Sequence, residues 1–360
     1  MNPIRLLLLC GGRSAEHEIS LISGWNVCNK LEPSTEFSIT LLTIDKNGDW
    51  YLQEVSSFLK QKPHAQSIHF GKNEHPILCK PGGDKQKFYD SFSKKYLPEF
   101  DVVFPLIHGP NGEDGSVQGL LEHLQLPYIG PGVLGSALCM DKVVAKQLMM
   151  AAEIPTSDFV VAIKGREISF KDVEEKLGLP VFIKPANMGS SVGVSKVNNE
   201  DEFQTGLTEA FLHDSKVIIE AFVDGIEVEC AVLGNEKIQV SRAGTYSHSD
   251  EFFDFDTKYI KDDVTMEIPA KTLTETEQNT VQELSKKAYE TLNCSGLARV
   301  DTFFTTDRKF MVNEINTIPG FTQHSMYPIL MEDRGLPYID LLKKLCELAI
   351  AKYKLTNAQS

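Results

Sequence analysis

Apolar and polar positions alternate along the first 130 residues in a way that predicts strands separated by helices. Ile4 to Cys10 is a continuous apolar run, typical of a buried strand, and it ends at Gly11-Gly12. A helix is expected from about Ser14 to Leu31, followed by strands at Phe37 to Ile44 and Asp101 to Ile107. Because strands alternate with helices, we expect βαβ units and a mostly parallel sheet.

The later segments change character. Ser136 to Ala152 predicts one helix, and Val181 to Lys184 and Val192 to Val197 predict strands joined by a loop of glycine and serine. Further elements are expected as a helix at Glu200 to Leu212, strands at Lys216 to Phe222 and within 225–243, a helix at Glu275 to Leu292, a pair of strands and a helix from Tyr338 to Tyr353. Residues 46–98 predict a surface elaboration, and residues 244–270 show no sustained period. Three α/β units fit this order better than two.

Composition narrows the class of protein. The chain has 360 residues, with 36 Lys and Arg against 50 Asp and Glu, and its formal net charge is −14. This acidic balance argues against a nucleic-acid partner, because phosphate backbones need clustered cations. No apolar run approaches the ~20 residues that a membrane-spanning helix needs, so no membrane partner is expected. The seven cysteines are scattered and never spaced as Cys-x-x-Cys, which favours reduced thiols over disulfides or a zinc site.

The N-terminal apolar run has some features of a secretory signal. It is too short for one, however, and it passes directly into Gly11-Gly12-Arg13. We therefore interpret it as a buried first strand. Together with the reduced thiols, this interpretation predicts a cytoplasmic protein.

Two glycine-rich segments are candidates for ligand binding. Gly130 to Gly135 matches the spelling Gly-x-Gly-x-x-Gly of dinucleotide-binding loops, but no firm strand precedes it and Pro131 lacks a backbone donor. A turn into a helix is the default interpretation, and a nicotinamide-dependent oxidoreductase is kept as an alternative. Asn187 to Gly193 could approach phosphate oxygens through its backbone, beside the positive charge of Lys184. Taken alone, the segment is more readily interpreted as a flexible hairpin with a solvent-facing lysine.

Two segments further along predict a hairpin with polar residues on one face. Ala298 to Phe304 and Lys309 to Asn316 are expected to pair as antiparallel strands. In the simplest register Phe304 lies opposite Lys309, and Arg299 then lies opposite Glu314.

The residues on that face are candidate metal ligands. Asp301, Glu314 and Asn316 offer hard oxygen atoms without His or Cys, a set that suits Mg²⁺. The alternative is a solvated face with a cross-strand Arg299–Glu314 ion pair. The segment Thr317 to Ser325 favours the functional interpretation, because its polar residues and glycine suit a substrate-holding turn.

Together these motifs resemble the D-alanine–D-alanine ligases. The resemblance rests on five ordered segments, namely Gly11 to Ser20, His108 to Gly115, Met140-Asp141-Lys142, Lys184 to Gly193, and Arg299 to Ser325. It implies a three-domain ATP-grasp fold of mixed α/β and α+β class. An N-terminal parallel-sheet α/β domain (residues 1–131) would precede a central domain (132–222) and a C-terminal domain (223–360) that clamp ATP between them.

The resemblance also implies the nucleotide and metal ligands. Lysine side chains and a serine-containing loop would contact the phosphates of ATP, and a strand edge would hold its adenine and ribose. The implied residues are Lys142, Lys184, Ser191, Glu220, Ala221, Phe222, Val223, Glu227 and Lys258. Asp301, Glu314 and Asn316 would hold two Mg²⁺ ions, with Mn²⁺ as an alternative metal.

Substrate roles follow from the same resemblance. Glu16 would bind the ammonium group of the first D-alanine, close to Ser190 and Tyr259, and His108 would lie near the transferred phosphate. Arg299 and the Gly320 amide would stabilise the oxyanion, and Ser325 would hold the carboxylate of the second D-alanine. Lys258 and Tyr259 would lie on a mobile lid within 244–270.

The implied reaction is ATP-dependent ligation of two D-alanines through an acyl phosphate, which supplies peptidoglycan precursors. The resemblance also implies that the enzyme is a homodimer and that its substrates are small molecules. Tyr259 favours dipeptide synthesis, because relatives that join D-alanine to D-lactate typically lack it. A D-alanine–D-lactate or D-alanine–D-serine ligase of the same fold is the alternative. Met326 and Ala221 depart from the leucine and lysine of some members. A non-catalytic nucleotide-binding protein would lack one of the metal or oxyanion residues, all of which are present. The sequence does not identify the base that deprotonates the attacking amine.

Overall fold

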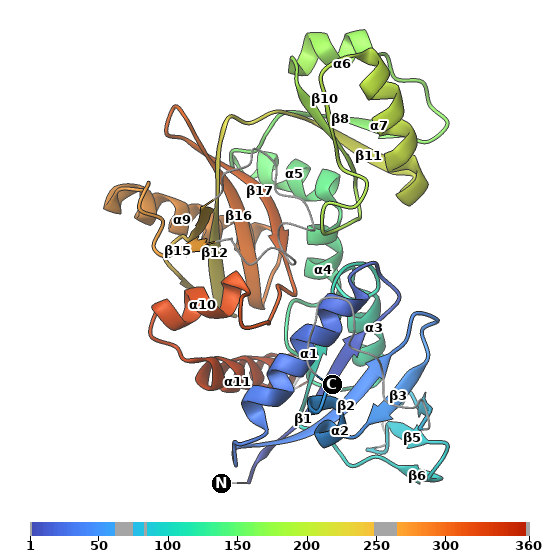
Figure 1. The fold of residues 1–360 in the computed structure, drawn as a ribbon. Coiled ribbons are helices and arrows are strands. Elements are labelled where there is room, and N and C mark those ends of the chain that lie inside the picture. The colour runs from blue at the N-terminus through green and yellow to red at the C-terminus, as the bar shows by residue number, and fades with distance from the viewer. Residues whose placement is uncertain (1, 62–74, 83–84, 248–264, 358–360) are drawn as a thin grey trace.

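Three four-stranded sheets follow one another along the chain (Figure 1). The computed structural model describes residues 2–61, 75–82, 85–247 and 265–357. In Figure 1 the N-terminal sheet lies at the bottom, the C-terminal sheet in the middle and the central sheet at the top. The order of the sheets agrees with three successive units, and the boundaries 1–131, 132–222 and 223–360 stay predictions.

The N-terminal sheet has the order β3-β2-β1-β7 and is parallel except between β2 and β3. Its strands are β1 (Ile4–Gly11), β2 (Phe37–Ile44), β3 (Trp50–Gln53) and β7 (Val102–Leu106), accompanied by α1 (His17–Leu31) and α3 (Ser116–His123). The expected mostly parallel sheet is thus confirmed, although α1 begins at His17 rather than near Ser14. Since β1 and β7 are parallel neighbours, the loops that follow them meet at one edge of the sheet.

Small elements from residues 46–98 extend this unit. They are α2 (Val55–Leu59) and the antiparallel strands β4 (Ile77–Cys79), β5 (Phe88–Asp90) and β6 (Lys95–Tyr96). Ile77 and Phe88 are buried in the cluster that includes Leu7 and Leu9 of β1. The elaboration therefore adds to the core of the N-terminal unit.

The helix predicted from Ser136 to Ala152 is in fact two helices. Helix α4 (Val133–Met140) ends at Asp141, whose backbone is extended, and α5 (Lys142–Ala151) begins directly after it. The Asp141 side chain accepts bonds from the backbone N–H groups of Val143 and Val144, so it caps α5. The prediction of one continuous helix is wrong. The apolar period continues through residue 141, but the Asp141 side chain bonds to the backbone N–H groups that follow it and so starts a new helix.

The central sheet is antiparallel, with the order β10-β9-β11-β8. Its elements are β8 (Phe159–Ile163), α6 (Phe170–Leu177), β9 (Val181–Pro185), β10 (Ser195–Val197), α7 (Glu200–His213) and β11 (Lys216–Ala221). One face is apolar and packs on α6 and α7. The other face carries Lys184 and Glu220 near α5. Strand β10 is shorter than predicted, because Ser190 and Ser191 take left-handed backbone angles in the preceding turn.

The C-terminal sheet has the order β13-β12-β16-β17 and is antiparallel. Its elements are β12 (Gly225–Gly234), β13 (Gln239–Val240), α9 (Glu275–Thr291), β16 (Gly296–Thr305), β17 (Phe310–Asn316), α10 (Met326–Asp333) and α11 (Tyr338–Asn357). A separate pair, β14 (Thr245–Ser247) and β15 (Thr265–Glu267), lies at the two ends of the segment that had no sequence period. Alternation along β16 turns Val300 toward the cluster that includes Val281 of α9 and turns Asp301 toward the opposite face.

The pairing of β16 with β17 differs from the predicted register. Asp301 lies opposite Glu314, and Arg299 lies opposite Asn316. The turn pairs Thr305 with Lys309, one residue later than expected, and the register shifts again beside Asp301. A β-bulge of this kind leaves an extra residue on one strand and cannot be read from an alternating pattern.

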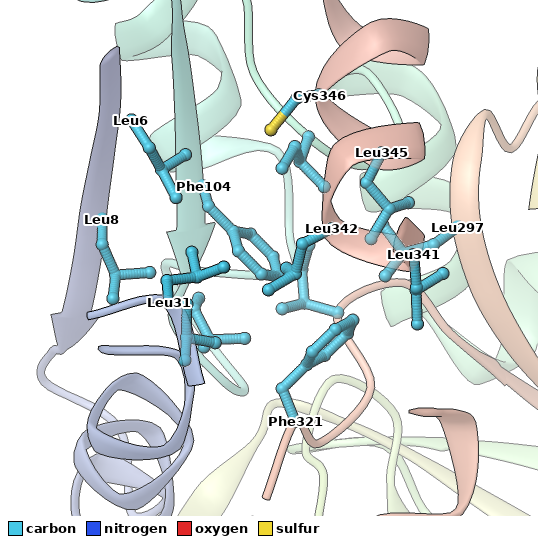
Figure 2. Packing of buried hydrophobic residues seen from close by; sticks show 14 of the residues in the cluster. Leu6, Leu8, Leu31, Phe104, Leu297, Phe321, Leu341, Leu342, Leu345 and Cys346 are labelled. Carbon is cyan, nitrogen blue, oxygen red and sulfur yellow. The ribbon is translucent and has the colours of Figure 1, made fainter. Parts of the chain in front are cut away.

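A large apolar cluster joins the N-terminal sheet to the C-terminal unit (Figure 2). Leu6, Leu8 and Phe104 of the N-terminal sheet face Leu341 and Leu342 of α11 in this cluster. Phe321, from the loop after β17, belongs to the same cluster, and its ring lies 5.2 Å from that of Phe104. The position of the 317–325 loop is therefore tied to the core between the two units.

Candidate functional site

One cavity of about 550 Å³ is lined by strands of the C-terminal sheet and by helices and loops that belong to the other two sheets. It is lined by segments that lie far apart in the sequence, including the face of α1, the loop after β7, the 188–190 loop and the segment from Glu314 to Met326. Nine of the predicted site residues line it: Glu16, His108, Lys142, Ser190, Arg299, Glu314, Asn316, Gly320 and Ser325.

A carboxylate closes one end of the cavity. Glu16 precedes α1 and is 8% exposed, and the Ser190 hydroxyl donates a hydrogen bond to its Oε1. A Cβ atom on Gly189 would come within 2.8 Å of Glu16 Oε2, so any larger residue there would displace the Glu16 carboxylate. The predicted Glu16–Ser190 pair is thus brought together by the fold.

The polar face of β16 and β17 forms another wall. Arg299 donates to both carboxylate oxygens of Asp301, at 2.7 Å each, and its Nε lies 2.8 Å from Glu229 Oε2. Asn316 donates from Nδ2 to Asp301 Oδ2 at 2.9 Å. Burial raises the pKa of Asp301 to about 6, although the Arg299 guanidinium opposes this effect.

These side chains fit a divalent cation that prefers oxygen ligands. Asp301 and Glu314 lie directly opposite each other, and Asn316 is bonded to Asp301, so two carboxylates and an amide share one small region. Lys142 approaches the same region, with its Nζ 3.2 Å from Glu314 Oε2 and 2.8 Å from the Met188 carbonyl oxygen. Such a donor set suits Mg²⁺ together with phosphate oxygens.

The proposed nucleotide side of the site contains a buried ion triad. Glu220 lies between two ammonium groups, with Lys146 Nζ 2.7 Å from its Oε1 and Lys184 Nζ 2.7 Å from its Oε2. Burial would raise the pKa of Glu220, but the charges of Lys146 and Lys184 outweigh it and hold the pKa well below its usual range. Sequence reasoning missed Lys146, which is 1% exposed and also donates to Ser157. Its i+4 spacing from Lys142 on one helix was the available signal.

Among the described residues predicted to bind the nucleotide, Lys142 lines the cavity, whereas Lys184, Glu220 and the others lie outside its lining. Ala221, Phe222 and Val223 follow Glu220 at the end of β11, and Phe222 is 43% exposed with Lys196 Nζ 5.2 Å from its ring centre. Ser191 lies in the turn that contains Ser190. Glu227 lies on β12 and accepts a hydrogen bond from Asn313 Nδ2 at 3.0 Å. Lys258 and Tyr259, with the predicted lid, lie outside the described residues.

The loop after β17 contributes Gly320 and Ser325 to the lining of the cavity. Ser325 Oγ accepts from the backbone N–H of Thr322 at 2.9 Å. A Cβ atom on Gly320 would meet Ser325 Oγ at 2.7 Å, so glycine lets the loop fold back on itself. Within the described part of the chain, no acceptor bonds the Gly320 N–H.

His108 and Glu113 link this loop to the N-terminal unit. His108 Nδ1 lies 2.9 Å from the carbonyl oxygen of Ile318, and burial lowers the pKa of His108 to about 4, so the ring is neutral near pH 7. Burial raises the pKa of Glu113 to about 7, and the negative charge of Glu16 adds to this effect. Sequence reasoning assigned no role to Glu113.

The Gly130 to Gly135 segment has a structural use. A Cβ atom on Gly130 would come within 2.9 Å of the Ile318 side chain, and one on Gly135 within 2.5 Å of the Asn293 carbonyl oxygen. The segment enters α4 at Val133, as the default interpretation expected. Its glycines serve the packing of the N-terminal unit against the C-terminal unit.

Comparisons with known proteins agree on one family. The model of the D-ala D-ala ligase N-terminus matches residues 5–131, and that of the D-ala D-ala ligase C-terminus matches residues 148–347. A D-alanine–D-alanine ligase of Proteus mirabilis is 43% identical over 358 residues, covering 99% of this chain and 98% of its own.

Solved structures give the same picture. The D-alanine–D-alanine ligase from Coxiella burnetii has a TM-score of 0.88 and 35% identity, covering 100% of this chain and 97% of its own. The VanG D-Ala:D-Ser ligase from Enterococcus faecalis has a TM-score of 0.84 and 35% identity, covering 96% and 99%. The expected fold class is therefore confirmed.

A search of the described helices for a membrane span is negative. None of them combines the length and the apolar character that crossing a bilayer requires.

Proposed function

The chain belongs to the D-alanine–D-alanine ligase family, and we propose that it uses ATP to join two D-alanine molecules into D-alanyl-D-alanine for peptidoglycan precursors. The observation that carries this proposal is that one cavity is lined by Glu16 and Ser190 together with Arg299, Gly320 and Ser325. It offers an anion for one amino acid's ammonium group and donors for a carboxylate and an oxyanion.

The first step activates a carboxylate that would otherwise not react with an amine. The carboxylate of the first D-alanine attacks the γ-phosphorus of ATP, which gives an acyl phosphate and ADP. Phosphoryl transfer depends mostly on position and on charge neutralisation. Lys142 and Lys184 supply positive charge, and Glu16 holds the ammonium group with the help of its bond to Ser190.

The second step forms the amide bond. The amine of the second D-alanine, after losing a proton, attacks the acyl carbon, and phosphate leaves. Negative charge develops on the carbonyl oxygen, where the Arg299 guanidinium and the Gly320 N–H stabilise it. Ser325 holds the carboxylate of the second D-alanine. Its hydroxyl accepts from the Thr322 N–H and lies 2.9 Å from Thr322 Oγ1, and it can donate its own proton to the carboxylate when the Thr322 hydroxyl is the donor of that second bond.

Asp301, Glu314 and Asn316 are the residues that would hold Mg²⁺, as two ions, or Mn²⁺ in its place. When bound, the metal neutralises charge on the phosphate oxygens during transfer. Asp301 also accepts two hydrogen bonds from Arg299, so one carboxylate would connect the metal ligands to the guanidinium that stabilises the oxyanion. Lys258 and Tyr259, on the predicted lid, would exclude water from the acyl phosphate.

A D-alanine–D-serine or D-alanine–D-lactate ligase is the second candidate. The similarity to a D-Ala:D-Ser ligase structure favours keeping serine as a competitor. The dipeptide is favoured by Tyr259 and by the relatives named D-alanine–D-alanine ligase at 41% to 43% identity. The proposal also includes that the protein is a homodimer and that it acts in the cytoplasm.

Phosphate release tests this proposal. Purified protein is mixed with ATP and Mg²⁺, and with either D-alanine or L-alanine. We expect phosphate release with D-alanine only, and its loss when EDTA removes the metal. Release that is independent of D-alanine, or equal with both enantiomers, would overturn the proposed function.

A further inference from the structure

Glu113 occupies a position between two loops that lie far apart in the sequence. It lies in the turn before α3 and lines the cavity. Its Oε1 accepts a hydrogen bond from the backbone N–H of Gly109 at 2.9 Å, within the loop after β7. Its Oε2 accepts from the backbone N–H of Ile318 at 3.0 Å and lies 3.3 Å from Thr317 Oγ1, both in the loop after β17. One carboxyl group thus joins the two loops.

The same stretch of the second loop is held at further points by the N-terminal unit. A carbonyl oxygen only accepts, so the neutral ring of His108 must donate from Nδ1 to the Ile318 carbonyl. Its Nε2 then accepts from the Ser23 hydroxyl at 3.0 Å, and Ser23 Oγ accepts from Phe321 N–H at 3.4 Å. Ile318 is therefore bonded through both its N–H and its C=O.

Gly320 lies between the two bonded residues of that loop. The N–H groups of Ile318 and Phe321 are both used by the N-terminal unit, and the Phe321 carbonyl accepts from Asn26 Nδ2 at 2.7 Å. Within the described residues the N–H of Gly320 has no acceptor. The backbone is therefore fixed before and after Gly320, while the N–H of Gly320 itself can donate to a ligand. A preorganised hydrogen-bond donor needs this arrangement.

The other loop that Glu113 holds borders the first amino-acid subsite. Gly109 lies against Glu16, since a Cβ atom there would come within 2.4 Å of Glu16 Oε2. The adjacent His108 carbonyl accepts from the Ser14 hydroxyl at 2.7 Å. A shift of the Gly109 backbone would therefore displace the Glu16 carboxylate.

We propose that Glu113 is a positioning residue whose carboxyl group holds the Gly320 loop and the Gly109 loop in fixed relation, and so aligns the two amino-acid subsites for ligation. This inference rests on the proposed function and deepens it. Both oxygens of Glu113 accept from backbone N–H groups. A glutamine of the same size has one accepting oxygen, and its amide N–H₂ would face the other N–H. Glu113→Gln therefore breaks one of the two links with little change of volume.

Asp114→Asn is a matched control for this substitution. Asp114 is the next residue and also accepts two backbone N–H bonds, from Asn111 at 2.8 Å and Ser116 at 2.9 Å. Both partners lie in the same turn, so this variant suffers a similar loss of bonding without affecting the loop after β17. Effects that come only from the stability of the turn will appear in both variants.

The experiment compares dipeptide formation and phosphate release in the wild type, Glu113→Gln and Asp114→Asn. A misplacement of reacting groups by about 1 Å costs on the order of 100-fold in rate. We expect kcat for dipeptide to fall about 10- to 100-fold in Glu113→Gln, with KM for ATP within about twofold of the wild type. We also expect more phosphate released per dipeptide, because the acyl phosphate is lost to water while the second subsite is misaligned.

Equal kinetics in Glu113→Gln and Asp114→Asn, with only the melting temperature changed, would overturn the proposal. Should Glu113→Gln fail to fold, Thr317→Val removes one bond to Glu113 while keeping the carboxyl group. A fall in its kcat with unchanged melting temperature supports the proposal, and unchanged kcat contradicts it. A wild type without D-alanine-dependent phosphate release would refute the proposed function, whereas an active wild type with unaffected variants refutes this inference alone.

Discussion

Asp301 is the single residue on which most of the chemistry depends. It is fully buried, lies opposite Glu314, and is bonded by Arg299 and Asn316. Asp301→Asn removes a negative charge and one accepting oxygen while keeping the shape of the side chain. We expect kcat to fall by about 100-fold or more, because charge neutralisation at the phosphates is lost. Steady-state kinetics and circular dichroism together check that turnover falls while the fold is retained.

Asp307→Asn is the control for this change. Asp307 lies in the turn between the same two strands, where its side chain is 60% exposed and pairs with Lys309. The same chemical change there should leave kcat within about twofold, since exposed ion pairs contribute little. Near-normal turnover in Asp301→Asn would refute the metal assignment.

The identities of these residues could be predicted from the sequence, but their pairing could not. Alternation along Ala298 to Phe304 places Arg299 and Asp301 on one face, and the structure agrees. The predicted pair of Arg299 with Glu314 is wrong, because the turn pairs Thr305 with Lys309 and the bulge beside Asp301 shifts the register once more, so that Glu314 lies opposite Asp301. Lys146 and Glu113 were missed because their importance comes from partners that are 74 and 205 residues away in the chain.

At the scale of elements, the break between α4 and α5 links helix stability to the site. Asp141 caps α5 and pairs with Lys216, and Lys142 follows it directly. Asp141→Ala should cost about 1 kcal/mol of stability through the lost cap. It should also raise KM for ATP, because Lys142 is no longer fixed beside Glu314. Thermal unfolding and steady-state kinetics measure the two effects.

Asn199→Ala tests whether the two effects are separate. Asn199 caps α7 through the backbone N–H of Glu202 and lies outside the cavity lining. We expect a similar loss of stability in this variant with unchanged KM for ATP. An equal rise of KM in both variants would show that general destabilisation is the cause.

The ion triad between α5 and the central sheet predicts a pH dependence of stability. The folded pKa of Glu220 lies below its unfolded value, so its stabilising effect is present above the unfolded pKa and is lost as the pH falls through the folded pKa. Glu220→Gln leaves Lys146 and Lys184 without their counter-charge, which should cost about 3–5 kcal/mol at pH 7. The difference in melting temperature from the wild type should therefore shrink as the pH falls below about 4.5.

Glu175→Gln is the comparison for that variant. Glu175 forms an exposed pair with Lys171 on α6, at 3.7 Å. A surface pair of this kind is worth about 0–1 kcal/mol, so its melting temperature should stay close to that of the wild type. Similar losses in Glu220→Gln and Glu175→Gln would contradict the buried triad.

For the whole molecule, the sequence pattern predicts the classes of the sheets more readily than the contacts between them. The mostly parallel N-terminal sheet follows from alternating strands and helices, and the long C-terminal helix follows from its apolar period. The cluster that joins Phe104, Phe321 and Leu342 could not be predicted from the sequence. An apolar residue indicates burial in a core, but its neighbours in the chain do not indicate which distant residues it will contact. The same cluster fixes the loop that carries Gly320.

The identity of the ligated product decides whether this protein is a D-alanine–D-alanine ligase. The protein is incubated with ATP, Mg²⁺ and equal amounts of D-alanine, D-serine and D-lactate, and the products are identified by mass. We expect D-alanyl-D-alanine as the main product, with one phosphate released per dipeptide. D-alanyl-D-serine or D-alanyl-D-lactate as the main product, or phosphate release without any ligated product, would contradict this expectation.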